Sequence, residues 1–217
     1  MDYTETFSPV VKPTSIRIIL SIAVTFNWDV KQLDVNNAFL NGYLKEDVFI
    51  KQPEGFIDPK RPKHVCKLVK AIYGLKQAPR AWFNRLRLTL QQWGFQNVVS
   101  DISLFYLLNF KLTVFILVYV DDILVISNDS NFLKEFTSKL NSMFALKDLG
   151  SLYYFLGIEV RRDNSSFYHN QGKYILHVLK RFGMTNCAAA ATPLVTGCKF
   201  STNDGEKMVD STLYHRA

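Results

Sequence analysis

The sequence has few cysteines and no long apolar run. Cys66, Cys187 and Cys198 are scattered and form no Cys-x-x-Cys pair, so the sequence indicates neither a disulfide framework nor a zinc site. A run of about 18 apolar residues and a signal-peptide pattern are both missing, so we expect no membrane span. The pattern predicts a soluble protein in a reducing, intracellular compartment, without deciding between cytoplasm and nucleus.

Acidic residues are outnumbered by basic ones. The 26 lysines and arginines against 19 aspartates and glutamates give a net charge of +7. Such an excess favours polyanionic partners such as nucleic acid, although charge alone does not separate DNA, RNA and acidic membrane. Hydrophobic residues make up 48% of the 217 residues, enough for one sizeable core and too many for a disordered chain.

Two apolar runs, Leu112 to Val118 and Ile123 to Ser127, predict strands joined by the turn Tyr119-Val120-Asp121-Asp122. Adjacent carboxylates between such strands repel each other and resist desolvation, so a divalent cation is the candidate that compensates them. A pair of aspartates in a turn is also ordinary solvated turn chemistry. The residues alone leave both interpretations open.

Periodicity predicts the other elements. Four helices are expected: one at 14–26, one that opens in the segment 73–83 and ends near residue 94, one at 130–146 and one at 171–182. Strands are expected near 32–35, 47–52, 64–70, 103–108, 153–162 and 167–169. The first helix is expected to be a buried core helix capped by Thr14 or Ser15, with Ile16, Ile19, Leu20 and Ala23 as its apolar stripe, and a strand is the less favoured alternative. The third is expected to bury Phe132, Phe136, Leu140 and Met143, and the fourth to turn Tyr174, Ile175, Val178, Leu179 and Phe182 inward. Residues 147–150 are expected to form a turn.

Four motifs occur in a familiar order. The segments 32–42 (QLDVNNAFLNG), 74–82 (GLKQAPRAW), 119–122 (YVDD) and 154–160 (YFLGIEV) resemble the reverse transcriptase domain of copia-type LTR retrotransposon Pol polyproteins. The resemblance implies an α+β fold, a right-hand polymerase palm with an antiparallel sheet and packed helices. Residues 1–182 are then the palm with partial fingers and the thumb base, and 183–217 a weakly ordered extension.

The resemblance also implies site residues. Asp34, Asp121 and Asp122 would be catalytic and hold two Mg²⁺ ions, with Mn²⁺ as a possible substitute. Nucleotide-binding residues would be Asn37, Ala38, Phe39, Gln77, Tyr119 and Lys147, with Phe39 excluding a 2′-hydroxyl and Lys147 protonating pyrophosphate. Primer and template would be contacted by Arg80, Gly157, Lys173 and Lys180. On the residues alone, an aspartate that closes a strand, such as Asp34, is more often a structural cap. The helix face that carries Arg80 is more often solvated than bound to nucleic acid, and the basic face that carries Lys173 and Lys180 is solvated as often as it is bound.

The implied function is RNA-directed DNA polymerisation, the addition of deoxynucleotides to a primer on an RNA or DNA template. The family's cationic fingers segment does not precede the match, so Met1 is expected to be an internal methionine of a larger polyprotein that supplies integrase and RNase H. Two alternatives stay open. One is an inactive remnant that binds nucleic acid or only folds, and the other is a globular protein whose Asp pair is structural.

Overall fold

The computed structural model describes residues 8–156, 158–162, 167–189 and 197. The chain divides into two compact units. The first contains residues 1–153 and 162–167, and the second contains residues 154–161 and 168–217. The functional division that the sequence predicts between residues 182 and 183 stays a prediction.

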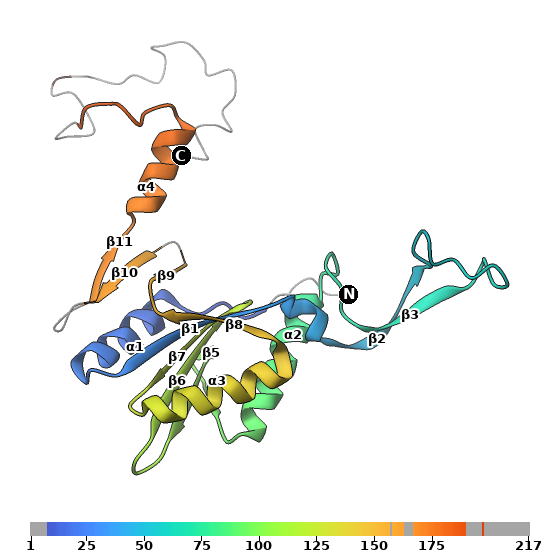
Figure 1. Cartoon of the computed structure of the whole chain (residues 1–217), viewed down its shortest axis with the longest axis horizontal. Helices are drawn as coiled ribbons and strands as arrows, with labels where there is room; N and C mark the ends of the chain where they lie inside the picture. Colours follow the sequence, from blue (N-terminus) through green and yellow to red (C-terminus); the bar gives the residue numbers. More distant parts are fainter. Residues whose placement is uncertain (1–7, 157, 163–166, 190–196, 198–217) are drawn as a thin grey trace. The chain divides into compact units, whose positions relative to one another are not determined.

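A six-stranded antiparallel sheet organises the first unit, with the strand order β4-β5-β6-β7-β1-β8 (Figure 1). Its strands are β1 (Asp29–Val35), β4 (Gln96–Val98), β5 (Asp101–Leu108), β6 (Thr113–Tyr119), β7 (Asp122–Ser127) and β8 (Leu146–Ser151). The predicted acidic hairpin is confirmed as β6 and β7. Both strands lie in the middle of the sheet, which explains why they are apolar on both faces.

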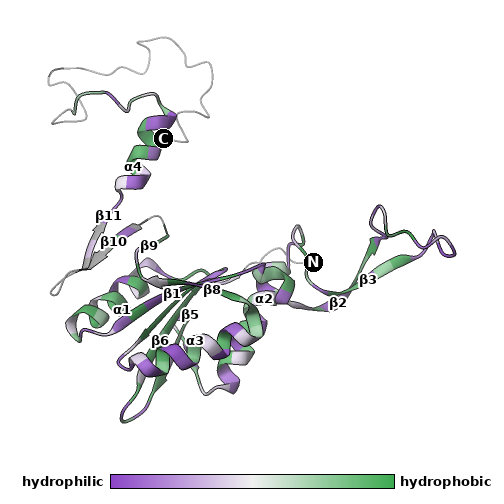
Figure 2. Cartoon of the chain, viewed as in Figure 1, coloured by the Kyte–Doolittle hydropathy of each residue, from purple (hydrophilic) through white to green (hydrophobic). Residues whose placement is uncertain are grey.

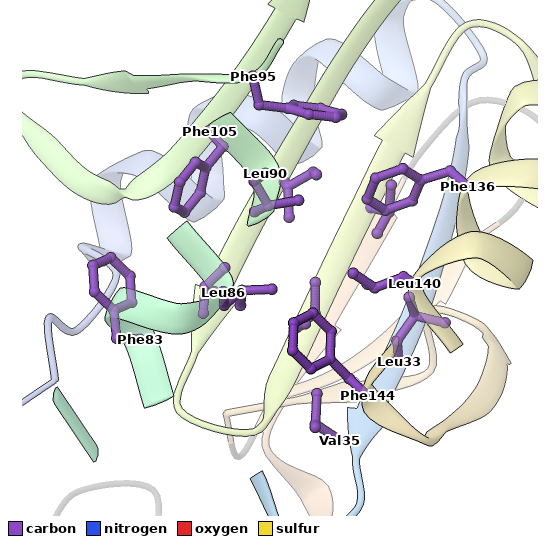
Figure 3. Close-up of a cluster of buried hydrophobic side chains, with 14 of the residues drawn as sticks. Leu33, Val35, Phe83, Leu86, Leu90, Phe95, Phe105, Phe136, Leu140 and Phe144 are labelled. Carbon is purple, nitrogen blue, oxygen red and sulfur yellow. The ribbon is translucent and has the colours of Figure 1, made fainter. Parts of the chain in front are cut away.

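Two helices cover one face of this sheet: α2 (Ala78–Gln92) and α3 (Ser130–Phe144) (Figure 1). Figure 3 shows the core under these helices, in which Leu140 and Phe144 of α3 lie beside Leu33 of β1, and Leu86 and Leu90 of α2 lie on the side of Phe105 of β5. Pro79 stands in the first turn of α2, where its missing N–H is not needed. The face of α2 with Trp82, Leu86 and Leu90 is buried.

The opposite face carries the alternate strand positions. Leu117, Leu124 and Ile126 are fully buried there, and Trp28, which follows α1 (Pro13–Thr25), stacks on Phe115 of β6 with ring centroids 6.3 Å apart. Helix α1 buries the predicted stripe, which consists of Ile16, Ile19, Leu20 and Ala23. Because this stripe faces the sheet from one side only, Ile18 remains 59% exposed. The prediction of a buried core helix is therefore right for this stripe and wrong for the side that carries Ile18.

The predicted cap of α1 is also wrong. Neither Thr14 nor Ser15 caps the helix through its side chain, since the N-cap is Lys12. Instead, the buried carboxylate of Asp101 in β5 accepts the Lys12 N–H at 2.9 Å and the Ser15 hydroxyl at 2.6 Å. The cap comes from a distant strand, so no local signal could reveal it.

A 3₁₀ helix and a two-stranded ribbon connect β1 to α2. The 3₁₀ helix η2 covers Ala38–Asn41, and the ribbon pairs β2 (Tyr43–Lys51) with β3 (Val65–Lys70). Most side chains of both strands are exposed or half-buried. Figure 2 shows the contrast in hydropathy between the central strands of the large sheet and the loop that joins β2 to β3.

Helix α3 begins after Asp129, whose side chain accepts the N–H groups of Asn131 and Phe132. It buries Leu133, Phe136, Thr137, Leu140 and Phe144. The predicted stripe is therefore only partly right, because Met143 is 42% exposed and Phe132 is half-buried. Compared with the prediction, the buried face of α3 includes Leu133 and Phe144, which pack in the core against the sheet.

Residues 147–150 are not a turn. They belong to β8, which pairs with the free edge of β1 across a bulge between Gln32 and Leu33. The turn-like Asp148 accepts the Gly150 N–H at 2.8 Å and forms an ion pair with Lys31 at 2.8 Å. The open edge of β1 supplies backbone partners that override the local turn preference.

The second unit begins with short strands. The strand predicted at 153–162 is instead the hairpin of β9 (Tyr154–Phe155) and β10 (Ile158–Arg162), because Leu156 adopts a positive φ of 51° and the chain reverses. Strand β11 (Phe167–Asn170) follows as predicted, and then α4 (Gly172–Arg181). No residue of α4 is buried. Of the predicted inward residues, Tyr174 and Ile175 are exposed, whereas Val178, Leu179 and Phe182 are half-buried, so the predicted face is only partly covered by the described residues.

Candidate active site

Four residues form a row across four neighbouring strands of the large sheet. Tyr119 of β6 is opposite Asp122 of β7, Asp122 is opposite Asp34 of β1, and Asp34 is opposite Lys147 of β8. Directly opposed residues of antiparallel strands place their side chains on the same face. The pairing therefore gathers residues that are far apart in the sequence.

The row lies on the face that points away from α2 and α3. Leu33 and Val35, the neighbours of Asp34, belong to the core under those helices, and so does Ile123, the neighbour of Asp122. Alternation along a strand therefore turns Asp34 and Asp122 to the other side. Both are half-buried, whereas Lys147 is exposed.

Asp122 is electrostatically strained. Burial is the main cause that raises its pKa above the ordinary value, and the neighbouring charge of Asp121 raises it further. A hydrogen bond from the Gln32 side chain opposes this and lowers the pKa, while the charge of Asp34 raises it. Like charges held side by side favour either a proton or a cation between them.

Gln32 is a site residue that the sequence-based prediction missed. It is only 6% exposed and precedes Asp34 by two positions on β1, so both side chains lie on the same face. A glutamine buried in a strand two residues from a candidate catalytic acid was the available signal. Its amide hydrogen bond supports the charged form of Asp122.

The turn between β6 and β7 consists of Val120 and Asp121. Val120 has a φ of 57°, which a β-branched residue rarely adopts. Its carbonyl oxygen accepts a hydrogen bond from the indole Nε1 of Trp82 at 2.6 Å. The Asp121 carbonyl accepts the N–H of Val35 at 2.9 Å, and the Asp121 side chain is exposed. Sequence patterns identify Trp82 as a core residue but not as a donor to this turn.

The proposed nucleotide-binding residues lie on the connection after β1 and at the start of α2. Asn37, with a φ of 51°, precedes η2, in which Ala38 is buried and Phe39 is half-buried. The Phe39 ring contacts that of Tyr73 with centroids 5.0 Å apart. Gln77 is the half-buried N-cap residue of α2.

Gly42 brings this connection close to α2. A Cβ atom at Gly42 would lie 2.7 Å from the backbone N of Trp82 and 2.8 Å from the backbone C of Ala81. Real Cβ atoms do not approach backbone so closely, so only glycine fits here without a shift. The glycine thereby links η2 to the same helix that contacts the acidic turn.

The proposed primer and template residues are distributed over both units. Arg80 is half-buried in α2 of the first unit. Lys173 and Lys180 are exposed on α4 of the second unit, where Lys173 lies 3.9 Å from a Glu159 carboxylate oxygen. Gly157 lies outside the described residues.

The donor set suits Mg²⁺, which prefers carboxylate oxygens and is commonly bound through one or two carboxylates together with phosphate and water. Asp34 and Asp122 provide such a facing pair. Within the described part of the chain, no group of three or more histidine, cysteine, aspartate or glutamate side chains is arranged to hold a metal ion.

The described part of the chain contains no helix with the length and apolar character needed to cross a membrane.

Comparison with known proteins gives this arrangement a family. The family model described as reverse transcriptase (RNA-dependent DNA polymerase) matches residues 1–196, and the chain belongs to that family. Within this family, the relatives identify the chain as the reverse transcriptase domain of a copia-type retrotransposon Pol polyprotein.

Three relatives show how far the likeness extends. The chain is 51% identical to the retrovirus-related Pol polyprotein from transposon RE1 of Arabidopsis thaliana and 49% identical to that from transposon RE2, in each case over 99% of this chain and 15% of the relative. It is 40% identical to the Pol polyprotein from transposon TNT 1-94 of Nicotiana tabacum, over 98% of this chain and 16% of that protein. No solved structure matches the chain.

Proposed function

We propose that this chain is the polymerising domain of a copia-type element and adds deoxynucleotides to a primer on an RNA or DNA template. The observation that carries the proposal is the direct pairing of Asp34 with Asp122 beside the Asp121 turn, in a chain whose family is RNA-dependent DNA polymerase. The net charge of +7 suits a nucleic acid partner.

In this proposal Asp34, Asp121 and Asp122 hold two Mg²⁺ ions. When bound, such ions favour deprotonation of the primer 3′-hydroxyl and neutralise charge on the leaving pyrophosphate. The chain's own contribution is to hold the carboxylates in place through the register of β1 and β7. Gln32 opposes the raised pKa of Asp122 and so favours its charged form.

The neighbouring residues receive the nucleotide. Backbone N–H groups around Asn37 and Ala38 receive the triphosphate, while Phe39 and Gln77 contact the sugar and Tyr119 flanks it. Lys147, opposite Asp34 on β8, donates a proton to pyrophosphate. Arg80, Gly157, Lys173 and Lys180 contact primer and template, and the chain supplies the palm, partial fingers and thumb base of a right-hand polymerase.

A primer-extension assay with and without Mg²⁺ tests this function. We expect extension that requires Mg²⁺ and disappears in Asp34→Asn and in Asp121→Asn. Glu135→Gln is the matched control, since it removes a carboxylate from the exposed surface of α3, which packs on the other face of the sheet. Extension that survives either aspartate substitution would remove the assignment.

A second candidate is a remnant that binds nucleic acid without polymerising. The specific observation in its favour is that the described residues contain no three-ligand group suited to a metal. A gel shift of a primer-template duplex, combined with no Mg²⁺-dependent extension by the unmodified chain, would favour this candidate. Absence of both would favour a fold whose Asp pair is only structural.

A further inference from the structure

The acidic turn adopts a conformation that its own sequence disfavours. Tyr119 and Asp122 are paired, so Val120 and Asp121 form a two-residue loop, and Val120 carries a φ of 57°. A first loop residue with positive φ is best served by glycine, because a Cβ atom crowds the backbone there. Valine, branched at Cβ, is a poor choice, so contacts outside the loop must hold this conformation.

Two hydrogen bonds from outside the hairpin hold the loop. The indole N–H of Trp82 donates to the Val120 carbonyl at 2.6 Å, and the backbone N–H of Val35 donates to the Asp121 carbonyl at 2.9 Å. Together these donors fix the orientation of both peptide groups of the loop. The side chain of Asp121 projects from the segment that they hold.

Trp82 is itself rigidly placed. It is fully buried, and its ring meets that of Phe144 edge-on with centroids 5.1 Å apart. Its backbone N lies against Gly42, so α2 cannot shift at this point without disturbing η2. A donor on so fixed a support has little freedom to follow a relaxing loop.

We propose that Trp82 is a positioning residue that holds the Val120–Asp121 loop in its left-handed form and so keeps Asp121 beside the facing pair of Asp34 and Asp122, where a cation would bind. Trp82 touches neither substrate nor metal in this proposal. The inference rests on the proposed function, because it assigns a purpose to the direction of the Asp121 carboxylate. It adds a residue whose action passes through a backbone carbonyl.

The first test is Mn²⁺ binding to the full chain without nucleotide or primer, measured by the electron paramagnetic resonance signal of free Mn²⁺. Trp82→Phe keeps the aromatic ring but removes the donor. We expect its Mn²⁺ affinity to fall by about 10-fold or more, as when an outer-shell partner of a metal ligand is lost. Unchanged affinity in a variant that folds would overturn the proposal.

Trp93→Phe is the matched control. Trp93 is half-buried and directly follows the last residue of α2, whereas Trp82 lies near the start of that helix. The Trp93 ring meets the Phe136 ring edge-on, with centroids 5.7 Å apart. The substitution removes the same chemical group. We expect Mn²⁺ affinity within about twofold of the unmodified chain, and an equal loss in both variants would show a general effect of weakened packing, against the proposal.

Val120→Gly provides a rescue that a merely structural role of Trp82 would not show. Glycine adopts the positive φ without strain, so the loop needs the indole less. In the Trp82→Phe background we expect Val120→Gly to restore most of the lost Mn²⁺ affinity. A further loss of affinity in the double variant would contradict the proposal.

If Trp82→Phe does not fold, the unmodified chain still provides a test. Coupling between sites is reciprocal, so a loop form that favours the cation must itself be favoured by the cation. We expect Mg²⁺ to slow hydrogen exchange of the Trp82 indole N–H severalfold, measured by NMR, and to leave Trp93 unchanged. Equal exchange with and without Mg²⁺ would overturn the proposal.

The two proposals fail differently. If the unmodified chain binds Mn²⁺ and Trp82→Phe weakens that binding, but no primer is extended, the proposed function fails and the positioning role stands. If primers are extended and Trp82→Phe binds Mn²⁺ normally, the function stands and the positioning role fails.

Discussion

Asp34 of β1 and Asp122 of β7 are directly opposed across an antiparallel pair, so the register of two strands holds two like charges side by side. Opposed like charges destabilise a sheet. Both side chains are half-buried, so solvent screens their repulsion only in part. The fold thus carries an electrostatic cost at the position where a divalent cation would remove it.

Asp122→Asn is expected to stabilise the cation-free protein near neutral pH. The pKa of Asp122 is raised in the folded state, so between the ordinary value of 3.8 and the raised pKa the folded state holds a proton that the unfolded state has lost. The free energy of unfolding therefore falls as the pH rises through this interval. The cost is present above the raised pKa and absent below the ordinary value of 3.8.

Thermal melts in a chelator check this expectation. The melting temperature of Asp122→Asn should exceed that of the unmodified chain near pH 7, and the difference should vanish as the pH approaches 3.8. Glu135→Gln on α3 serves as the control. A gain that does not depend on pH would point to packing at Asp122 instead of charge.

Gly42→Ala is expected to disturb both stability and nucleotide use. The added Cβ would meet the backbone of Ala81 and Trp82, which cannot give way as a flexible side chain could. We expect a loss of about 1–3 kcal/mol in the free energy of unfolding, and a raised KM for deoxynucleotides because η2 and α2 move apart.

Denaturant titration and primer-extension kinetics measure the two effects of Gly42→Ala. Gly55→Ala is the control, since a Cβ there meets nothing within 4 Å and only the φ of 81° disfavours it. It should cost about 1–2 kcal/mol and leave KM unchanged. Equal KM in both variants would show that the Gly42 contact does not serve the nucleotide.

Phe39→Ala is expected to relax discrimination against ribonucleotides. Phe39 is half-buried beside Tyr73, at the connection that follows β1. Removing its bulk should reduce the preference for deoxynucleotides by about 10-fold or more. Competing incorporation of a ribonucleotide and a deoxynucleotide measures the ratio, with Tyr73→Ala to separate the role of its ring neighbour. An unchanged ratio would make Phe39 only a packing residue.

Asp101→Ala is expected to loosen α1 from the sheet. The buried carboxylate accepts hydrogen bonds from the Lys12 N–H, the Ser15 hydroxyl and the Ser103 N–H. Its loss leaves the buried Ser103 N–H and the partly buried donors of Lys12 and Ser15 without this acceptor, so the free energy of unfolding should fall by about 1–3 kcal/mol. Ser15→Ala, which removes one donor alone, should cost less in the same denaturant titration. Equal costs would show that the other two bonds contribute little.

Local patterns predicted the strongest elements well. The apolar runs of β6 and β7, the stripe of α1 and the proline-started helix α2 were all readable, because their partners fill the positions that periodicity marks. The patterns failed at β8, where pairing with the open edge of β1 outweighed the local turn preference of residues 147–150. They also failed at α4, whose apolar positions remain unburied within the described residues. A stripe shows which face is apolar but not whether anything covers it.

The sequence by itself determined the family, the acidic turn and the order of the motifs, since these depend on residue types at short spacing. Tertiary structure decided that Asp34 is opposite both Asp122 and Lys147, that Gln32 reaches Asp122, and that the Trp82 indole meets the Val120 carbonyl. Strand register and the packing of α2 set these contacts. They join segments from four parts of the chain, and no local pattern encodes where distant segments meet.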